Sequence, residues 1–215
     1  YGKIENINNE SRWQFNQNTF WELKNFITYN TSLLNHNVTV MAGQEVSEWR
    51  YEYLSGASTG LTSNDIHSPS LGQSSSHRIG SGFGSGAMAS FFTRTAYNFN
   101  DRYYATYTFR YDGSSNFGPE NRWAPFHATS VMWRVSNESF WEGLSPVVNN
   151  FRIRGGWGQT GNANINSYLW GASITRMPTG LGMGYRQSNI ANPFIQWEKQ
   201  EMYNLGVDLG FFQNR

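Results

Sequence analysis

The sequence has no cysteine, little charge and no long apolar run. Without cysteine the chain forms no disulfide and offers no thiolate to a metal. No stretch approaches the ~18 consecutive apolar residues that indicate a transmembrane helix, and no basic block suggests a nucleic-acid partner. Charged residues make up only 14% of the 215 residues, whereas typical soluble proteins have about 25%. We therefore expect part of the protein surface to face something other than water.

Aromatic residues are abundant instead, at 17% of the sequence, and they follow a pattern. In residues 102–112, RYYATYTFRYD, almost every second side chain is aromatic, while the intervening ones are mostly polar or charged. A period of two predicts a β-strand, because successive side chains point to opposite faces. The same pattern predicts about seven principal strands, at residues 20–30, 38–53, 87–99, 102–112, 124–135, 151–160 and 202–210.

The predicted connections alternate between short and long. Turns are expected at 31–37 and 100–101 and a helical turn within 136–146, whereas Gly-, Ser- and Asn-rich outer loops are expected at 56–86, 113–123 and 161–197. Residues 1–19 are expected to be a loop or a strand extension, and a small hairpin is expected around 168–175 and 183–186. This alternation of loop lengths is typical of a transmembrane β-barrel.

In a barrel, each strand presents one face to lipid and the other to the lumen. The predicted lipid-facing residues are Phe91, Tyr97, Tyr103, Tyr107, Phe109, Val131, Trp133, Ile153, Leu205 and Val207. The predicted lumen-lining residues are Arg94, Arg110, Arg134, Arg152, Arg154 and Asp208. Aromatics near strand ends, namely Tyr97, Phe99, Tyr103, Trp133 and Tyr203, are expected to form interfacial girdles. Alternation alone also fits a soluble antiparallel β-sandwich, but the low charge and the loop lengths favour the barrel.

No catalytic or metal-binding constellation stands out. The four histidines are scattered without metal-ligand spacing, and Glu45, Glu48 and Glu52 are expected to be lumen or loop carboxylates rather than a glycosidase pair. The glycine run at 82–87 lacks the strand and helix of a nucleotide site and predicts a flexible loop entering a strand.

Aromatic residues in or beside the loops are the candidates for substrate binding, because aromatic rings stack on sugars. They are Trp49, Tyr51, Tyr53, Trp123, Tyr168, Trp170, Tyr185 and Trp197. The alternative is that they brace the loops or meet a partner. The loop 112–123, DGSSNFGPENRW, also allows two interpretations. Phe117 and Trp123 could stack on a ligand, or the segment could be a self-packed corner with Gly113 and Gly118 at positive φ.

Five motifs occur in order: TVMAGQE (39–45), ASFFTRTAYNFNDRYYATYTFRYDGSSNFG (89–118), NRWAPFHATSVMWRVSNESFW (121–141), FRIRGGWGQTGN (151–162) and WEKQEMYNLGVDLGFFQNR (197–215). Together they resemble the SusC/RagA-like TonB-linked outer-membrane transporters of Bacteroidota. The resemblance implies an all-β, antiparallel transmembrane barrel of the 22-stranded, plugged type, located in the outer membrane. It also implies import of oligosaccharides or peptides with a SusD-like surface lipoprotein, without cofactors or covalent chemistry.

The resemblance further implies coupling to the TonB complex through an N-terminal region with a plug domain. That region is not in this sequence, which begins at Tyr1 without a signal-peptide pattern. We therefore expect the chain to be a central-to-late slice of a barrel, from a fragment or a longer protein. A soluble β-sandwich that binds carbohydrate or mediates adhesion is the alternative, and a barrel enzyme is a third hypothesis that lacks the necessary residue pairing.

The face assignment predicts asymmetric effects of substitution. Tyr107→Arg or Val131→Arg should impair membrane assembly of the full-length protein by about 2–4 kcal/mol if the site lies at mid-membrane, whereas Thr106→Arg or Ser130→Arg should be mild. The amount of folded full-length protein recovered from the membrane measures the difference between substitutions on the two faces. Equal losses on both faces would contradict the assigned orientation.

Overall fold

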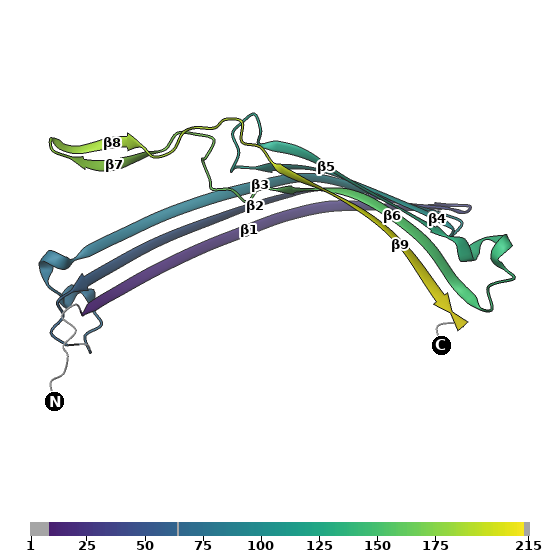
Figure 1. Cartoon of the computed structure of the whole chain (residues 1–215), viewed down its shortest axis with the longest axis horizontal. Coiled ribbons are helices and arrows are strands. Elements are labelled where there is room, and N and C mark those ends of the chain that lie inside the picture. Colours follow the sequence, from purple (N-terminus) through teal and green to yellow (C-terminus); the bar gives the residue numbers. More distant parts are fainter. Residues whose placement is uncertain (1–8, 64, 213–215) are drawn as a thin grey trace. The chain divides into compact units, whose positions relative to one another are not determined.

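The computed structural model of the chain describes residues 9–63 and 65–212. Seven strands form one sheet in the order β1-β2-β3-β4-β5-β6-β9, and β7 and β8 form a separate hairpin (Figure 1). The outer strands of the sheet are therefore β1 and β9. This arrangement confirms the predicted all-β class and the seven principal strands.

Most strands are longer than the pattern predicts. Their bounds are β1 Glu10–Leu33, β2 His36–Thr59, β3 Arg78–Phe99, β4 Tyr103–Ser114, β5 Trp123–Arg134, β6 Val148–Asn162, β7 Ile174–Thr179, β8 Gly182–Gln187 and β9 Glu198–Phe211. Single 3₁₀ turns lie at Pro69–Leu71, Ser74–Ser76, Val135–Asn137 and Ser139–Trp141. None of the helical turns in the described part of the chain is long and apolar enough to cross a bilayer.

The chain divides into two compact units. Unit 1 comprises residues 1–21 and 48–86, and unit 2 comprises residues 22–47 and 87–215. The strands β1, β2 and β3 each contribute residues to both units, whereas β4 to β9 belong entirely to unit 2.

The predicted loops are longer than the observed loops, because the flanking strands extend into them. The strand β1 already begins at Glu10, so residues 10–19 follow the strand-extension alternative for 1–19, and residues 1–8 lie outside the described residues. The predicted loop 56–86 reduces to 60–77, 113–123 reduces to 115–122, and 161–197 reduces to 163–197. The last of these contains the hairpin of β7 and β8, which confirms a small hairpin there, although its bounds differ from those predicted.

Glycines explain the largest of these errors. Within unit 1, three glycines of β3 lie beneath aromatic rings of β2, and a Cβ on any of them would collide with the ring. Glycine in a strand marks such close approaches. The pairs are Gly82 with Tyr53, Gly84 with Tyr51 and Gly86 with Trp49. The flexible loop predicted at 82–87 is therefore a paired strand, because its glycines make room for rings from a neighbouring strand.

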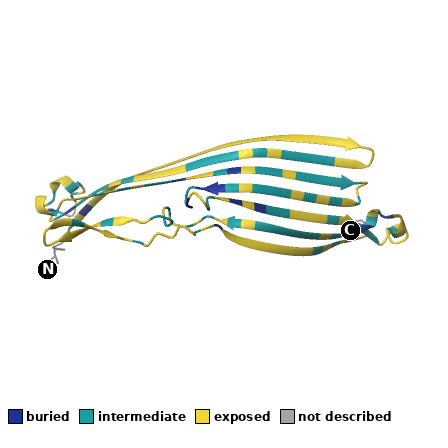
Figure 2. Ribbon diagram, turned by 90° about the horizontal axis from the view of Figure 1, so that it is seen from above, coloured by how far each residue is buried: buried dark blue, intermediate teal, exposed yellow. Residues whose placement is uncertain are grey.

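In unit 2 the strands β3, β4, β5, β6 and β9 pair antiparallel, with one register shift between Val148 and Asn150 of β6. Tyr107 of β4 lies opposite Thr95 of β3 and Thr129 of β5, and Thr129 lies opposite Trp157 of β6. Exposed and less exposed residues alternate along the strands, as Figure 2 shows by colour. A small buried core lies at the loop end of this sheet, and it comprises Phe117, Ala124, Phe126 and Trp197.

The predicted tight turn at Asn100 and Asp101 is confirmed. Both residues have positive φ, 51° and 52°, and the amide of Arg102 donates to the carbonyl of Phe99 at 3.0 Å. Two positive φ values define the hairpin turn whose twist matches its strands. Asn98 Oδ1 accepts a hydrogen bond from the Asp101 amide at 3.0 Å, which fixes the turn further.

This turn should not tolerate a β-branched residue. Asn100→Val places a branched side chain in the left-handed region, at a cost of about 1–2 kcal/mol, whereas Asn100→Gly should be nearly neutral. Urea unfolding of the full-length protein in detergent measures both. A Val variant as stable as wild type would contradict the turn geometry.

Candidate functional site

The register brings the ten predicted lipid-facing residues to one face of the sheet in unit 2. One row across five strands consists of Tyr97, Ala105, Val131, Gly155 and Leu205. The larger side chains of this face have no covering layer among the described residues, and Leu205 is 82% exposed. The described residues form no second sheet of comparable size, so the sandwich alternative lacks its packing partner. Contact of this face with lipid remains a prediction.

The six predicted lumen-lining residues share the opposite face. Arg94 lies opposite Thr108, Arg134 opposite Arg152, and Arg152 opposite Asp208. Arg154 lies opposite Met132 on the same face. The sequence pattern thus grouped these residues correctly, and their exposure to a lumen remains a prediction.

Two aromatic clusters lie on the apolar face at opposite ends of the strands. The turn-end cluster contains His36, Tyr97, Phe99, Tyr103 and Trp133, with ring centroids 4.7–6.4 Å apart in its stacked pairs. The loop-end cluster contains Phe91, Tyr111 and Trp123, with centroids 5.1–6.1 Å apart.

The spacing of these clusters fits a bilayer. On β3, Phe91 and Phe99 are separated by about 27 Å of strand, and barrels carry an apolar band about 25 Å tall between aromatic girdles. Four of the five predicted girdle residues lie in the turn-end cluster. The fifth, Tyr203, lies opposite Trp157, four positions further along the strands.

Glu138 joins the turn-end cluster to the connection after β5. Its carboxylate accepts hydrogen bonds from Tyr103 Oη at 2.7 Å and Trp133 Nε1 at 3.0 Å, and it pairs with Arg102 at 3.1 Å. Its side chain is only 9% exposed. The hydrogen bonds from Tyr103 and Trp133, aided by Arg102, hold the pKa of this carboxyl below its usual range, although burial opposes them. Sequence reasoning missed this residue, and nothing in the sequence distinguishes it from Glu142 four residues later.

The loop 112–123 is a packed corner. Phe117 is fully buried, and its ring lies 5.2 Å from that of Trp197, whose Nε1 donates to the carbonyl of Arg122 at 3.0 Å. Asn116 donates to the carbonyl of Ala163 at 3.0 Å, which ties the corner to the segment 163–197. Phe117 and Trp197 are therefore not available to stack on a ligand.

The predicted positive φ at Gly113 and Gly118 is wrong. Neither glycine has a positive φ. A Cβ on Gly113 would lie 2.7 Å from the indole of Trp123, and one on Gly118 would lie 3.5 Å from Trp170. Close packing of Trp123 therefore explains Gly113, whereas a Cβ on Gly118 would make only an ordinary contact with Trp170.

Four of the predicted substrate-binding residues contribute to the sheet instead. Trp49, Tyr51 and Tyr53 cover the glycines of β3 in unit 1. Trp123 stacks on Tyr111 at 5.1 Å in the loop-end cluster of the apolar face. For these four residues the geometry favours the bracing alternative.

The remaining three lie in the segment 163–197 of unit 2. Trp170 packs against Gly118, and its exposure is intermediate. Tyr168 is 60% exposed and Tyr185, on β8, is 67% exposed. Tyr168 and Tyr185 therefore remain the candidates with a free ring.

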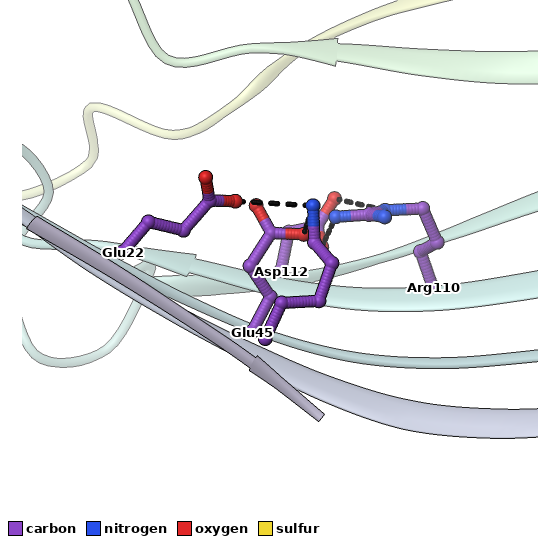
Figure 3. Close-up of polar contacts among 5 residues, drawn as sticks. Glu22, Glu45, Arg110 and Asp112 are labelled. Atoms are coloured by element: carbon purple, nitrogen blue, oxygen red, sulfur yellow. Dashed lines mark hydrogen bonds and ion pairs between the residues drawn. The ribbon is translucent and has the colours of Figure 1, made fainter. Parts of the chain in front are cut away.

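Charged side chains gather on the polar face at the loop end of unit 2. Figure 3 shows Glu22, Glu45, Arg110 and Asp112 converging from β1, β2 and β4. Lys24 Nζ lies 3.0 Å from both Glu22 and Glu45, and Arg110 makes two hydrogen bonds to Asp112 at 3.1 and 3.3 Å. Each cation of this group is held in ion pairs with carboxylates of the group, so the arrangement is structural. Arg110 was predicted to line the lumen, and Glu45 was predicted to be a lumen or loop carboxylate.

No chemistry beyond binding is apparent. Glu45 pairs with Lys24, and Glu48 pairs with Arg50 at 3.0 Å in unit 1, so two of the three carboxylates considered for hydrolysis are held in ion pairs. Across residues 9–63 and 65–212, no group of His, Asp and Glu could hold a metal ion.

Comparison with known proteins identifies the family. No protein-family model matches the chain. The curated relatives include TonB-dependent receptor P3 of Formosa agariphila, which is 26% identical over 214 residues, 97% of this chain and 21% of the relative. They also include SusC of Bacteroides thetaiotaomicron, 32% identical over 60% of this chain and 14% of the relative. A solved chain of the RagAB peptide transporter superimposes with a TM-score of 0.87 at 30% identity, over 95% of this chain and 23% of that one.

The chain belongs to the SusC/RagA group of TonB-dependent receptors. Its antiparallel sheet matches a slice of the RagA barrel. Receptors of this family are non-enzymatic outer-membrane β-barrels, and this membership confirms the predicted family, fold and location. The chain spans about a fifth of the length of the curated receptors it matches.

The Glu138 anchor should be pH-dependent. Because its pKa is depressed in the folded state, its stabilisation is present above the unfolded pKa of about 4.3 and is lost as pH falls through the folded pKa. Glu138→Gln should therefore be less stable than wild type at neutral pH, and the gap should narrow at about pH 3. The urea concentration at the unfolding midpoint, measured for the full-length receptor at both pH values, gives this difference in stability. The exposed Glu142→Gln is the control. A gap that does not narrow would contradict the anchoring role of the charge.

Proposed function

We propose that this chain is part of one β-barrel domain of an outer-membrane nutrient importer. The barrel takes up oligosaccharides or peptides together with a SusD-like surface lipoprotein, and the TonB complex supplies energy through the N-terminal region of the receptor. Its single strongest support is the likeness to the RagAB peptide transporter over 95% of the chain. The likeness to SusC supports the same role.

The two-faced sheet supports this proposal physically. A continuous apolar face with aromatic clusters about 27 Å apart suits a bilayer. The opposite face carries the charges that a wet lumen accommodates. Substrate moves without covalent chemistry, so selectivity comes from contacts along the path.

The segment 163–197 is proposed to contact the substrate. Its exposed rings, Tyr168 and Tyr185, suit stacking on sugar rings or on peptide side chains. Loops supported by a rigid scaffold commonly hold binding residues. The buried corner around Phe117 provides that support here, because Asn116 also accepts a hydrogen bond from Ser167 at 3.0 Å.

Uptake by the full-length receptor tests the proposal. Cells that carry the receptor should accumulate a labelled oligosaccharide or peptide pool, and a protonophore or loss of TonB should abolish this accumulation. Membranes without detergent should retain the protein, and a lipoprotein should co-purify with it. Uptake that is independent of TonB, or a protein that is soluble without detergent, would refute the importer function.

The double substitution Tyr168→Ala and Tyr185→Ala should weaken substrate affinity about tenfold, equivalent to about 1.4 kcal/mol. The matched control is Leu181→Ala, a fully exposed residue of the same hairpin. Affinity unchanged by the double variant would remove these rings from the substrate path while leaving the importer function intact.

A further inference from the structure

An excess of arginine lies at the turn end of the polar face. The arginine cluster comprises Arg134 at the end of β5 and Arg152 and Arg154 of β6. The register places Arg134 directly opposite Arg152. Like charges in this position destabilise a sheet unless a counter-charge compensates them.

Among the described residues, one carboxylate forms an ion pair with this cluster. Asp208 lies opposite Arg152, yet its carboxylate pairs with Arg154 at 3.3 Å. The side chain of Arg154 crosses Gly206 to reach it, and a Cβ on Gly206 would lie 2.7 Å from Arg154 Nε. The counter-charge is therefore committed to one arginine of the three.

The other two guanidinium groups lack an anionic partner among the described residues. Arg134 lies over the ring of Tyr104, 5.6 Å from its centroid. The Nε atoms of both Arg134 and Arg152 are shielded from solvent and make no hydrogen bond within the described part of the chain. Within the described part of the chain no carboxylate forms an ion pair with Arg134 or Arg152, so the positive charge of this pair is available to an acceptor from elsewhere.

The loop end of the same face shows the contrast. There Lys24 pairs with Glu22 and Glu45, and Arg110 pairs with Asp112, as Figure 3 shows. The arginine cluster lies at the other end, beside the turn at Asn100, where Arg134 N donates to the carbonyl of Arg102 at 2.7 Å. Its position is therefore remote from the exposed rings of the segment 163–197.

We propose that the arginine cluster docks an acidic segment of the plug that fills the barrel lumen. This inference depends on the proposed function, because it places the polar face inside a plugged barrel. About four-fifths of the receptor lies outside this chain, judged by its curated relatives. Guanidinium groups bind carboxylates in a bidentate fashion, so paired Asp or Glu side chains of the plug match Arg134 and Arg152.

Passive conductance of the full-length receptor in planar bilayers tests this docking. The double substitution Arg134→Gln and Arg152→Gln should raise the open population about tenfold, equivalent to about 1.4 kcal/mol. Replacement of both by Lys should restore most of the closed state, because charge is kept. Arg176→Gln with Arg186→Gln in the β7–β8 hairpin is the matched control and should leave conductance unchanged.

Cross-linking provides an independent measurement. A photo-reactive residue in place of Met132, which lies opposite Arg154 on the same face, should cross-link to an Asp- or Glu-rich stretch of the plug. The Gln double variant must assemble in the membrane to wild-type level for the comparison. Neither measurement uses substrate, so both remain informative if the importer function fails.

Two outcomes would overturn the proposal. One is unchanged conductance of the Gln double variant together with no cross-link to an acidic plug segment. The other is a loss of affinity for an acidic peptide or sugar at unchanged conductance, which would assign the arginines to the transported ligand.

Discussion

The antiparallel register is the constraint on which the rest of the structure depends. Because side chains alternate with a period of two, a slip of one residue between β4 and β5 would exchange the two faces. Such a slip would place Tyr107 beside Ser130 and carry the charge of Arg134 to the apolar side. The anchor at Glu138 opposes such a slip, because it accepts hydrogen bonds from both Tyr103 of β4 and Trp133 of β5. The hairpin turn at Asn100 fixes the register between β3 and β4 in the same way.

The sequence alone predicted the strands whose faces differ sharply in polarity. Residues 102–112 show this best, because their aromatic and polar positions alternate without interruption. The same contrast correctly grouped Arg94 with Arg154, and Val131 with Leu205, on strands that lie apart in the sequence. For such strands the local pattern is sufficient to predict the strand and its two faces, because the contrast in polarity lies within the strand itself.

The predictions were wrong where a residue type has its reason in a distant strand. Gly84 was predicted to lie in a loop, yet it lies in β3. The residue is a glycine because the ring of Tyr51 of β2 lies over it and leaves no room for a Cβ. Gly113 was assigned to a special backbone conformation, although Trp123 requires its missing side chain. Tyr51 and Trp123 each lie over a glycine, which the sequence does not reveal, and their role in substrate binding stays a prediction.

The outer strands β1 and β9 carry a consequence for biogenesis. Each has one neighbour in the sheet, so its other edge presents unpaired amide and carbonyl groups. Hydrocarbon offers these groups no hydrogen-bond partner. In a bilayer the sheet would therefore need a hydrogen-bond partner along each of its two outer strands, and its insertion would be cooperative with whatever supplies those partners.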